Sequence, residues 1–449
     1  MNIQNQLPHN AALLKTLTLL TAFSIPLCGT IGLFTLLASL LLLLILIAAC
    51  SKDKPLKQGL LWVKQFSATG YYAGLSWLAF TFISLIIVLI DEHTGLRKIA
   101  GVGRQLYILL EIGFALILID QIKQQRIQAE HIIYALALGF FTLITYQAFA
   151  IYNYPIQQVG FWSWTPLMAP NIRDTGHIAC AVIVSLFCFS LQAKRLNHVI
   201  LYATLTLLAI TYLMWTGGRT GNAAMLITLS LISLVNLIFA GTVTKKIKGL
   251  VIALTTVFFA FHLCNQWAVY DWNGFQRIEK QFSKQLFSLG GASSSDKLPD
   301  SAVYQDKQMK EEAKGHRNIM WSQAWQAFKR SPIIGLGPNG WFFSAEKTAS
   351  GAVQDQPHNI FLQTLVEWGV IGSSLFFIML LAIVCPHLKF SRLKAAFEHN
   401  HTIYLSAISI VTVLSLHSLT SGTYWNFQSV STIVIAYSLW ISQPSASQR

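Results

Sequence analysis

Charged residues are scarce in this chain of 449 residues, at 11% of the sequence, whereas hydrophobic residues make up 54%. A water-soluble domain carries about a quarter charged residues, so the composition argues against a soluble protein. The apolar residues fall in runs of roughly 18 to 22, the length that a helix needs to cross a bilayer. The strict alternation of a membrane β-barrel is missing, which leaves α-helical spans to satisfy the backbone in lipid.

Disulfide bonds are not expected in the largest polar stretch, residues 266–357, because none of the six cysteines lies there. The net charge of +14 would suggest nucleic acid as the partner of a soluble protein. In a membrane protein, Lys and Arg instead orient the loops. We therefore expect the lipid bilayer as a partner and no nucleic acid.

The hydrophobic runs predict an all-α polytopic membrane protein of about twelve transmembrane helices. An apolar run follows Lys15 and a second one follows at once, so we interpret the first as a retained helix and not as a cleaved signal peptide. We expect helices one to nine in residues 1–265, a large loop with amphipathic helices in 266–357, and three helices with a short tail in 358–449. The predicted spans are 11–28, 30–50, 70–90, 104–120, 131–151, 175–192, 198–215, 220–240, 248–265, 359–385, 402–419 and 427–442.

Basic residues are divided unevenly between the two sets of loops. Fourteen lie in loops on the side of the N-terminus, whereas the short loops on the other side hold five. Because loops rich in Lys and Arg stay in the cytoplasm, we expect both termini to be cytoplasmic and the large loop to face outside. The basic residues of the short outside loops are Arg97, Lys98, Arg104, Arg173 and Arg219.

Arg219 lies where the topology needs no positive charge, in the glycine-rich turn 216–220 between two predicted spans. A cation held at the membrane boundary by such a turn is a candidate contact for an anion. The alternative is an arginine that extends to lipid headgroups. The residue by itself leaves both interpretations open.

The large loop contains two segments with helical periodicity. Residues 275–289 place apolar residues on one face and basic residues elsewhere, which predicts a helix on the membrane surface, and a Gly- and Ser-rich stretch follows at 290–295. A second helix is predicted to end before Ser331, and Arg317 precedes Trp321 by one turn on its apolar face. Because a charge on an apolar face needs a partner, we expect another helix or a ligand anion there. The predicted apolar face is Trp321, Ala324, Trp325 and Phe328.

The loop closes with a turn rich in proline and glycine, from Pro332 to Gly340, and then with Pro357-His358-Asn359 directly before a long span. His358 is therefore expected near a helix N-terminus at the outer surface. The positive end of the helix dipole disfavours imidazolium. A neutral imidazole near pH 7 is what a general base requires. The alternative is a histidine that only caps the helix.

Five short motifs follow one another in the second half of the chain: Gly217-Gly218-Arg219, Arg317 with Trp321 and Ala324, Pro332-Ile333-Ile334-Gly335-Leu336-Gly337, His358-Asn359-Ile360-Phe361-Leu362, and Glu367-Trp368-Gly369-Val370-Ile371-Gly372. This set resembles the bacterial O-antigen ligase and polymerase superfamily. The superfamily includes O-antigen ligases, O-antigen polymerases and the protein O-oligosaccharyltransferases that modify pilins. The resemblance is densest between about residues 315 and 372, and the span pattern extends it over the whole chain.

The resemblance implies about twelve helices and a helical periplasmic loop, in the inner membrane of a bacterium. It implies metal-independent transfer of a glycan, without a cofactor, from an undecaprenyl-diphosphate donor to a hydroxyl acceptor. His358 matches the family's essential histidine. Arg219 and Arg317 match its diphosphate-binding arginines, and Arg173 matches a further basic position more loosely. Some members carry a larger C-terminal extension; this chain ends soon after its last span, so we expect no extended acceptor-binding domain.

Four residues near these motifs are secondary candidates. Asn359 and His316 each adjoin a motif residue. Asp174 and His177 share a helical face and would fit one side of a metal site. Two ligands without a further cluster do not predict a metal site, so none is expected.

Other titratable residues are weaker candidates for the functional site. His262 and His417 lie near the outer ends of predicted spans and are candidates to line the cavity. Glu367 follows His358 by nine residues, half a helical turn out of phase, so we expect it to pack against another helix and not to orient that histidine. Glu111 is an acidic residue within a predicted span, and two interpretations are open. It either marks an ion path or forms a hydrogen bond between helices, and we favour the hydrogen bond.

The expected chemistry is a single inverting displacement, because a lipid-linked sugar diphosphate is already activated. His358 would take the proton of the acceptor hydroxyl while the arginines neutralise the leaving diphosphate. Lipid A-core, a growing glycan chain and a pilin Ser/Thr all remain open as acceptors, so an O-antigen polymerase is the alternative within the superfamily. A transporter or flippase of an anionic lipid or solute is the alternative of another class. No repeat relates the two halves of the chain, which argues against it.

Overall fold

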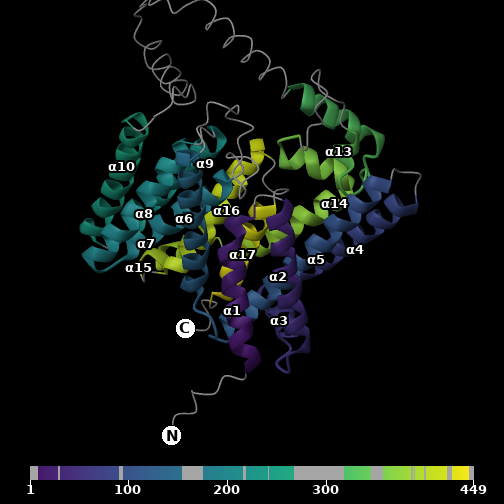
Figure 1. Cartoon of the computed structure of the whole chain (residues 1–449), viewed down its shortest axis with the longest axis horizontal. Helices are drawn as coiled ribbons and strands as arrows, with labels where there is room; N and C mark the ends of the chain where they lie inside the picture. The colour runs from purple at the N-terminus through teal and green to yellow at the C-terminus, as the bar shows by residue number, and fades with distance from the viewer. Residues whose placement is uncertain are drawn as a thin grey trace, which may run out of the picture.

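The computed structural model describes residues 9–28, 31–90, 95–153, 175–215, 219–240, 242–266, 318–344, 357–385, 388, 390–398, 401–421 and 427–443. Every regular element in these ranges is a helix (Figure 1). The predicted class, an all-α polytopic membrane protein, is confirmed. The helix predicted at 275–289 and the stretch at 290–295 lie outside these ranges.

Each predicted span corresponds to one helix of the structure. The first part of the chain forms α1 (His9–Ser24), the short 3-10 turn η2 (Ile25–Leu27), α2 (Ile31–Cys50), α3 (Pro55–Phe66), α4 (Ala68–Ile90), α5 (Gly95–Lys123) and α6 (Ala129–Asn153). The second part forms α7 (Gly176–Gln192), α8 (Leu196–Trp215), α9 (Arg219–Phe239), α10 (Val243–Gln266), a helix over 318–330, α13 (Gly340–Ser344), α14 (Ile360–Val384), α15 (Phe390–Glu398), α16 (Thr402–Ser421) and α17 (Phe427–Ser442).

Eight of the described helices are long and apolar enough to cross a membrane: α4, α5, α6, α8, α9, α10, α14 and α16. A ninth candidate is the pair formed by α2 and α3, which is bent by 94°. α7, and α1 together with η2, are shorter apolar helices. The number of about twelve spans and the division into three regions therefore remain predictions.

Two features of the fold differ from the prediction. α5 begins at Gly95 and not at residue 104, so Arg97, Lys98 and Arg104 belong to a helix and not to an outside loop. The prediction left these residues out of the helix because a search for apolar runs stops at charged residues. In the structure, Arg97 and Arg104 have hydrogen-bond partners, which are described below. The short helices α3 and α15 were not predicted because both are too polar to form a span. Pro55 occupies the first turn of α3, where its missing N–H costs no helix hydrogen bond.

α7 occupies the centre of one group of helices. Every residue from Gly176 to Leu191 is buried. The helix packs against α8, α9, α16 and α17, and also touches α6 and α10. A helix that is apolar all round is typical of a core position, since no face of it needs to meet solvent or lipid.

α4 and α14 run side by side along most of their lengths and form the core of the other group. The Ser67 hydroxyl donates to the Ala382 carbonyl at 2.9 Å. The Trp77 ring lies edge-on to Trp368, with 5.1 Å between the ring centroids. Gly372 allows the Phe80 ring to approach the backbone of α14 closely. These contacts fix α14, the helix whose first turn follows His358.

α14 is broken at Gly369, where φ is 60° and ψ is −164°. The break removes the helix bonds from residues 370 and 371 back to 366 and 367. A turn over residues 331–337 replaces them: Leu336 and Gly337 donate to the carbonyls of Val366 and Glu367, both at 2.8 Å. In return, the N–H groups of residues 370 and 371 donate to the carbonyls of residues 332 and 333, at 2.8 and 3.1 Å. We call this backbone arrangement the α14 clasp.

Two glycines make the α14 clasp possible. Gly335 and Gly369 both have positive φ, at 73° and 60°. A Cβ atom on Gly335 would overlap the carbonyl of Glu367, and one on Gly369 would overlap the carbonyl of Ile333. The two motifs that contain these glycines therefore meet backbone to backbone, with no room for a side chain between them.

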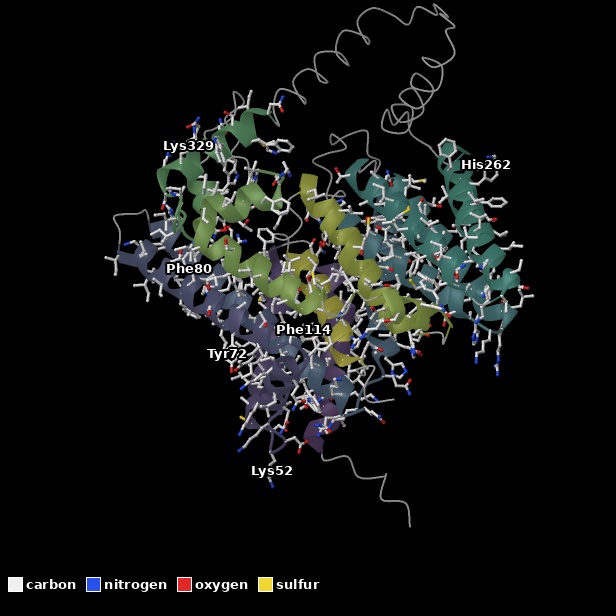
Figure 2. All side chains as sticks on the ribbon, turned by 180° about the vertical axis from the view of Figure 1, so that it is seen from behind. Lys52, Tyr72, Phe80, Phe114, His262 and Lys329 are labelled. Carbon is white, nitrogen blue, oxygen red and sulfur yellow. The ribbon has the colours of Figure 1, made fainter. Side chains whose placement is uncertain are left out.

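Labelled residues mark two opposite ends of the helix bundle. Figure 2 shows Lys329 and His262 at one end and Lys52 at the opposite end. The predicted topology assigns these residues to opposite sides of the membrane in the same way. Which end faces the cytoplasm remains a prediction.

We expect Gly335→Ala to lower the stability of the folded protein by about 2 kcal/mol or more, because it combines overpacking with a strained positive φ. Gly103→Ala is the matched control, since no atom lies within 4 Å of a Cβ built there. The measurement is the thermal unfolding midpoint of each variant in the same detergent. Equal midpoints for the two variants would contradict the α14 clasp.

Candidate functional site

The last turns of α16 connect the beginnings of α9 and α14. The His417 ring lies over Gly221, in the first turn of α9, with its Nε2 atom 3.2 Å from where a Cβ would stand. Two residues later, the Leu419 carbonyl accepts a hydrogen bond from the Asn359 side chain at 3.3 Å. The helix that begins at Arg219 and the helix that follows His358 are thereby held at the same end of the bundle.

His358 occupies a constrained turn before α14. Its φ of 52° lies in the left-handed region, which costs a non-glycine residue roughly 1–2 kcal/mol. Asn359 is the N-cap of α14, because its side-chain oxygen accepts from the Leu362 N–H at 3.1 Å. The alternative that His358 itself caps the helix is therefore wrong, and Asn359, a secondary candidate, has this structural role.

The helix over 318–330 is tied to the same turn. The Trp321 indole N–H donates to the Pro357 carbonyl at 3.0 Å. The helix ends before Ser331, as predicted. Its buried face differs from the predicted one: Met320, Ala324 and Ala327 are buried, whereas Trp325 is 45% exposed. The apolar periodicity predicted the helix correctly. The predicted buried face was wrong because it included Trp325, a large apolar residue that is exposed.

His177 contacts a serine and a second histidine. Its Nδ1 atom and the Ser429 hydroxyl are 2.7 Å apart. Its ring lies edge-on to His417, with 4.2 Å between the centroids, and both histidines are buried. Within the described ranges, no group of three or more His, Cys, Asp or Glu residues could hold a metal ion. Asp174, the proposed companion of His177, lies outside those ranges.

A chain of hydroxyl and amide groups lies beside this histidine pair. The Tyr212 hydroxyl donates to the Gln147 side chain at 2.7 Å and is 2.6 Å from the Thr175 hydroxyl. Thr175 precedes the first turn of α7, and the Cys180 thiol donates to the Gly221 carbonyl at 3.5 Å. These contacts join the starts of α7 and α9. The positive ends of the α7, α9, α14 and α17 dipoles therefore gather at this end of the bundle, an arrangement that favours an anion.

The arginines proposed for anion binding are only partly described. Arg219 opens α9, but its side chain is not among the described groups. Arg173, His316 and Arg317 lie outside the described ranges. The structure therefore shows where the helices next to these residues begin. The positions of the arginine and histidine side chains remain predictions.

A buried polar cluster beside the α14 clasp was not predicted as a unit. Arg104 donates to the Asn339 side chain at 2.8 Å and lies 4.0 Å from Glu367, whose side chain is 1% exposed. Arg97 donates to the Leu336 carbonyl. The expectation that Glu367 packs against another helix is confirmed, since Arg104 belongs to α5. The pairing escaped sequence analysis because Arg104 was assigned to a loop.

Two further candidates are also placed. Glu111 accepts a hydrogen bond from the Ser431 hydroxyl, which is 2.9 Å from the Tyr107 hydroxyl. This contact joins α5 to α17 and confirms the expected hydrogen bond between helices. His262 is exposed near the end of α10, whereas His417 is buried beside His177.

We expect Glu367→Ala to destabilise the protein by about 3 kcal/mol, because it leaves the Arg104 charge poorly compensated in a largely buried site. The double variant Arg104→Met with Glu367→Leu should recover most of that loss, since it removes both charges and keeps the volume. The test compares the unfolding midpoints of the wild type, the single variants Arg104→Met and Glu367→Leu, and the double variant. A double variant as unstable as the sum of the single ones would contradict this pairing.

The comparison with known families was made on the sequence. A family model described as "Wzy_C: O-Antigen ligase" matches residues 204–377. The matched residues run from α8 to the second half of α14, and include Arg219, the α14 clasp and His358. A search of curated proteins finds no match. Residues 204–377 are therefore similar to the O-antigen ligase family, in agreement with the resemblance that the motifs of this part of the chain show.

Proposed function

We propose that the protein is a membrane glycosyltransferase that transfers a glycan from undecaprenyl diphosphate to a hydroxyl acceptor on the periplasmic side of the inner membrane. The observation that carries the proposal is the meeting of the α9 and α14 starts at the end of α16, through His417 and Leu419. Both helix starts lie within the residues that match the O-antigen ligase family.

The donor diphosphate is assigned to Arg219 and Arg317, with Arg173 as a further contact. An arginine stays charged and grips phosphate oxygens through two parallel N–H bonds. The gathered N-termini of α7, α9, α14 and α17 add positive potential in the same region. This combination stabilises the charge that develops on the leaving diphosphate.

His358 is assigned as the general base. Its nitrogen takes the proton of the acceptor hydroxyl while that oxygen forms the new bond to the anomeric carbon. The bond between the anomeric carbon and the phosphate oxygen breaks, and the lipid diphosphate leaves with the electron pair. One displacement of this kind inverts the anomeric configuration, and no metal is assigned a role.

Two side chains support the position of His358. Asn359 caps α14 and binds the end of α16, so the residue next to the base is tied to two helices. Trp321 holds the Pro357 carbonyl on the other side. A base held by its neighbours on both sides loses little orientational freedom on reaction, which is a recognised source of rate enhancement.

The acceptor defines the alternatives within the superfamily. A ligase would use lipid A-core, a protein-directed enzyme would use a pilin Ser or Thr, and a polymerase would extend a lipid-linked glycan. Deletion of the gene distinguishes them. Loss of the lipopolysaccharide ladder with an unchanged core supports the ligase, whereas a lighter pilin with normal ladders supports the protein-directed enzyme.

His358→Ala should lower glycan transfer by about 100- to 10,000-fold, because a positioned general base contributes that much. Donor binding should be unchanged. The assay uses purified protein in proteoliposomes with a lipid-linked glycan donor. His198→Ala is the matched control, since His198 is exposed at the start of α8, away from the site. Wild-type transfer by His358→Ala would remove the assigned base, and solute uptake without any transfer would favour a transporter.

Arg219→Ala should lower transfer by about 100- to 1000-fold, the usual effect of removing a contact to developing charge. Arg219→Lys should fall between this variant and the wild type, because it keeps the charge and loses the paired N–H geometry. Arg195→Ala, an exposed arginine between α7 and α8, is the control. An Arg219→Ala variant with normal rate and normal donor affinity would contradict the assignment.

A further inference from the structure

The α14 clasp presents two adjacent isoleucines to the outside. Ile333 is 62% exposed and Ile334 is 39% exposed, although both belong to a turn and not to a predicted span. Adjacent large apolar side chains on a rigid turn form a patch that favours contact with apolar material. Leu336 and Gly337, at the other end of the turn, contact α4, α5 and α14 instead.

The patch continues the lipid-facing surface of α14. The Val370 N–H donates to the Pro332 carbonyl, and the Ile371 N–H donates to the Ile333 carbonyl. Val370 and Ile371 are themselves exposed on a helix that is apolar enough to cross a membrane. The turn and the helix therefore share one apolar surface, joined by backbone hydrogen bonds.

Two helices indicate the depth of the turn. Val370 lies about ten residues, or about 15 Å, beyond the first residue of α14. On the other side, Gly337 packs against Ser84 and Val88, in the last two turns of α4. Both helices thus place the turn within their own apolar lengths and not beyond their ends.

Much of the backbone of the turn is hydrogen-bonded within the protein. In lipid, polar backbone groups must be satisfied within the protein. The Gly335 N–H donates to the Ser331 carbonyl at 2.9 Å, and the α14 clasp satisfies the next two N–H groups. Arg97 covers the Leu336 carbonyl. Only apolar side chains remain on the outer side.

Charged and aromatic residues adjoin the patch on the side of the bundle end. Lys329 and Arg330 are exposed at the end of the helix over 318–330, about one turn before Ile333. The Lys329 amine lies 6.0 Å from the centre of the exposed Trp325 ring. Basic side chains beside a tryptophan are typical of the headgroup level, where they reach phosphates.

We propose that residues 331–337 form a re-entrant turn in the leaflet on the side where α14 begins, with Ile333 and Ile334 against phospholipid acyl chains. Lys329 and Arg330 then lie at the level of the lipid phosphates. This inference does not depend on the glycosyltransferase assignment. It moves the end of the large loop from the water phase into the bilayer.

Spin labels on single cysteines test the proposal. The protein, with its six native cysteines replaced, is placed in nanodiscs of phosphatidylethanolamine and phosphatidylglycerol, and collisions with oxygen and with a water-soluble nickel chelate are compared. Ile333→Cys is the test position, Val370→Cys is the lipid control and Ser322→Cys is the water control, since both control residues are exposed. We expect an oxygen-to-nickel ratio several-fold higher at Ile333→Cys than at Ser322→Cys, and equal to that at Val370→Cys.

Two results would overturn the proposal. A nickel collision rate at Ile333→Cys equal to that at Ser322→Cys would place the turn in water. Exclusion of both reagents would show that a protein surface, such as a second copy of the chain, covers the patch. Ile334→Cys gives an independent measurement if Ile333→Cys does not fold, as judged by its unfolding midpoint. Quenching of a fluorophore on the same cysteines by brominated acyl chains supplies a second readout.

Discussion

The backbone exchange between the turn at 331–337 and the break in α14 is the interaction on which the arrangement of the site depends. A helix broken inside a membrane leaves polar groups that lipid cannot satisfy. Here the turn supplies both the missing donors and the missing acceptors. The first half of α14 can therefore take its own direction at Gly369 while every exchanged bond stays within the protein. That direction brings Asn359 to the end of α16 and sets the position of His358.

Charge reinforces the same region. Arg97 and Arg104 extend from α5 to Leu336, Asn339 and Glu367, so two helices and the segment between them share a buried polar cluster. Such a cluster tolerates few alternative packings, because an unpaired charge in a low-dielectric site is costly. The motifs that carry the resemblance to the superfamily thus combine two kinds of residue. Gly335, Gly369 and Glu367 build the framework, whereas His358 precedes α14 and Arg219 is the first residue of α9.

Hydropathy predicted the helical class and the helices that correspond to the expected spans, because long apolar runs are a strong local signal. It misplaced the start of α5, since a window that rejects charge cannot anticipate that Arg97 and Arg104 find partners distant in sequence. The prediction that Glu367 packs against another helix was correct. It needed only the spacing between Glu367 and His358 along one helix, which the sequence contains. The role of Asn359 as the N-cap, the left-handed His358 and the histidine pair were not predicted, because each depends on packing between distant segments or on a single dihedral angle. The side-chain positions of the proposed arginines remain predictions.

The complete burial of α7 has a mechanical consequence. Its 17 residues span about 25 Å, less than the hydrocarbon thickness of a bilayer. A lipid-facing helix of that length would respond to the thickness of the membrane by tilting or by thinning the bilayer. α7 has no lipid face, so its neighbours absorb any such stress. The histidine pair and the start of α9 are attached to this sheltered helix, so we expect the end of the bundle where they lie to respond little to changes in lipid composition.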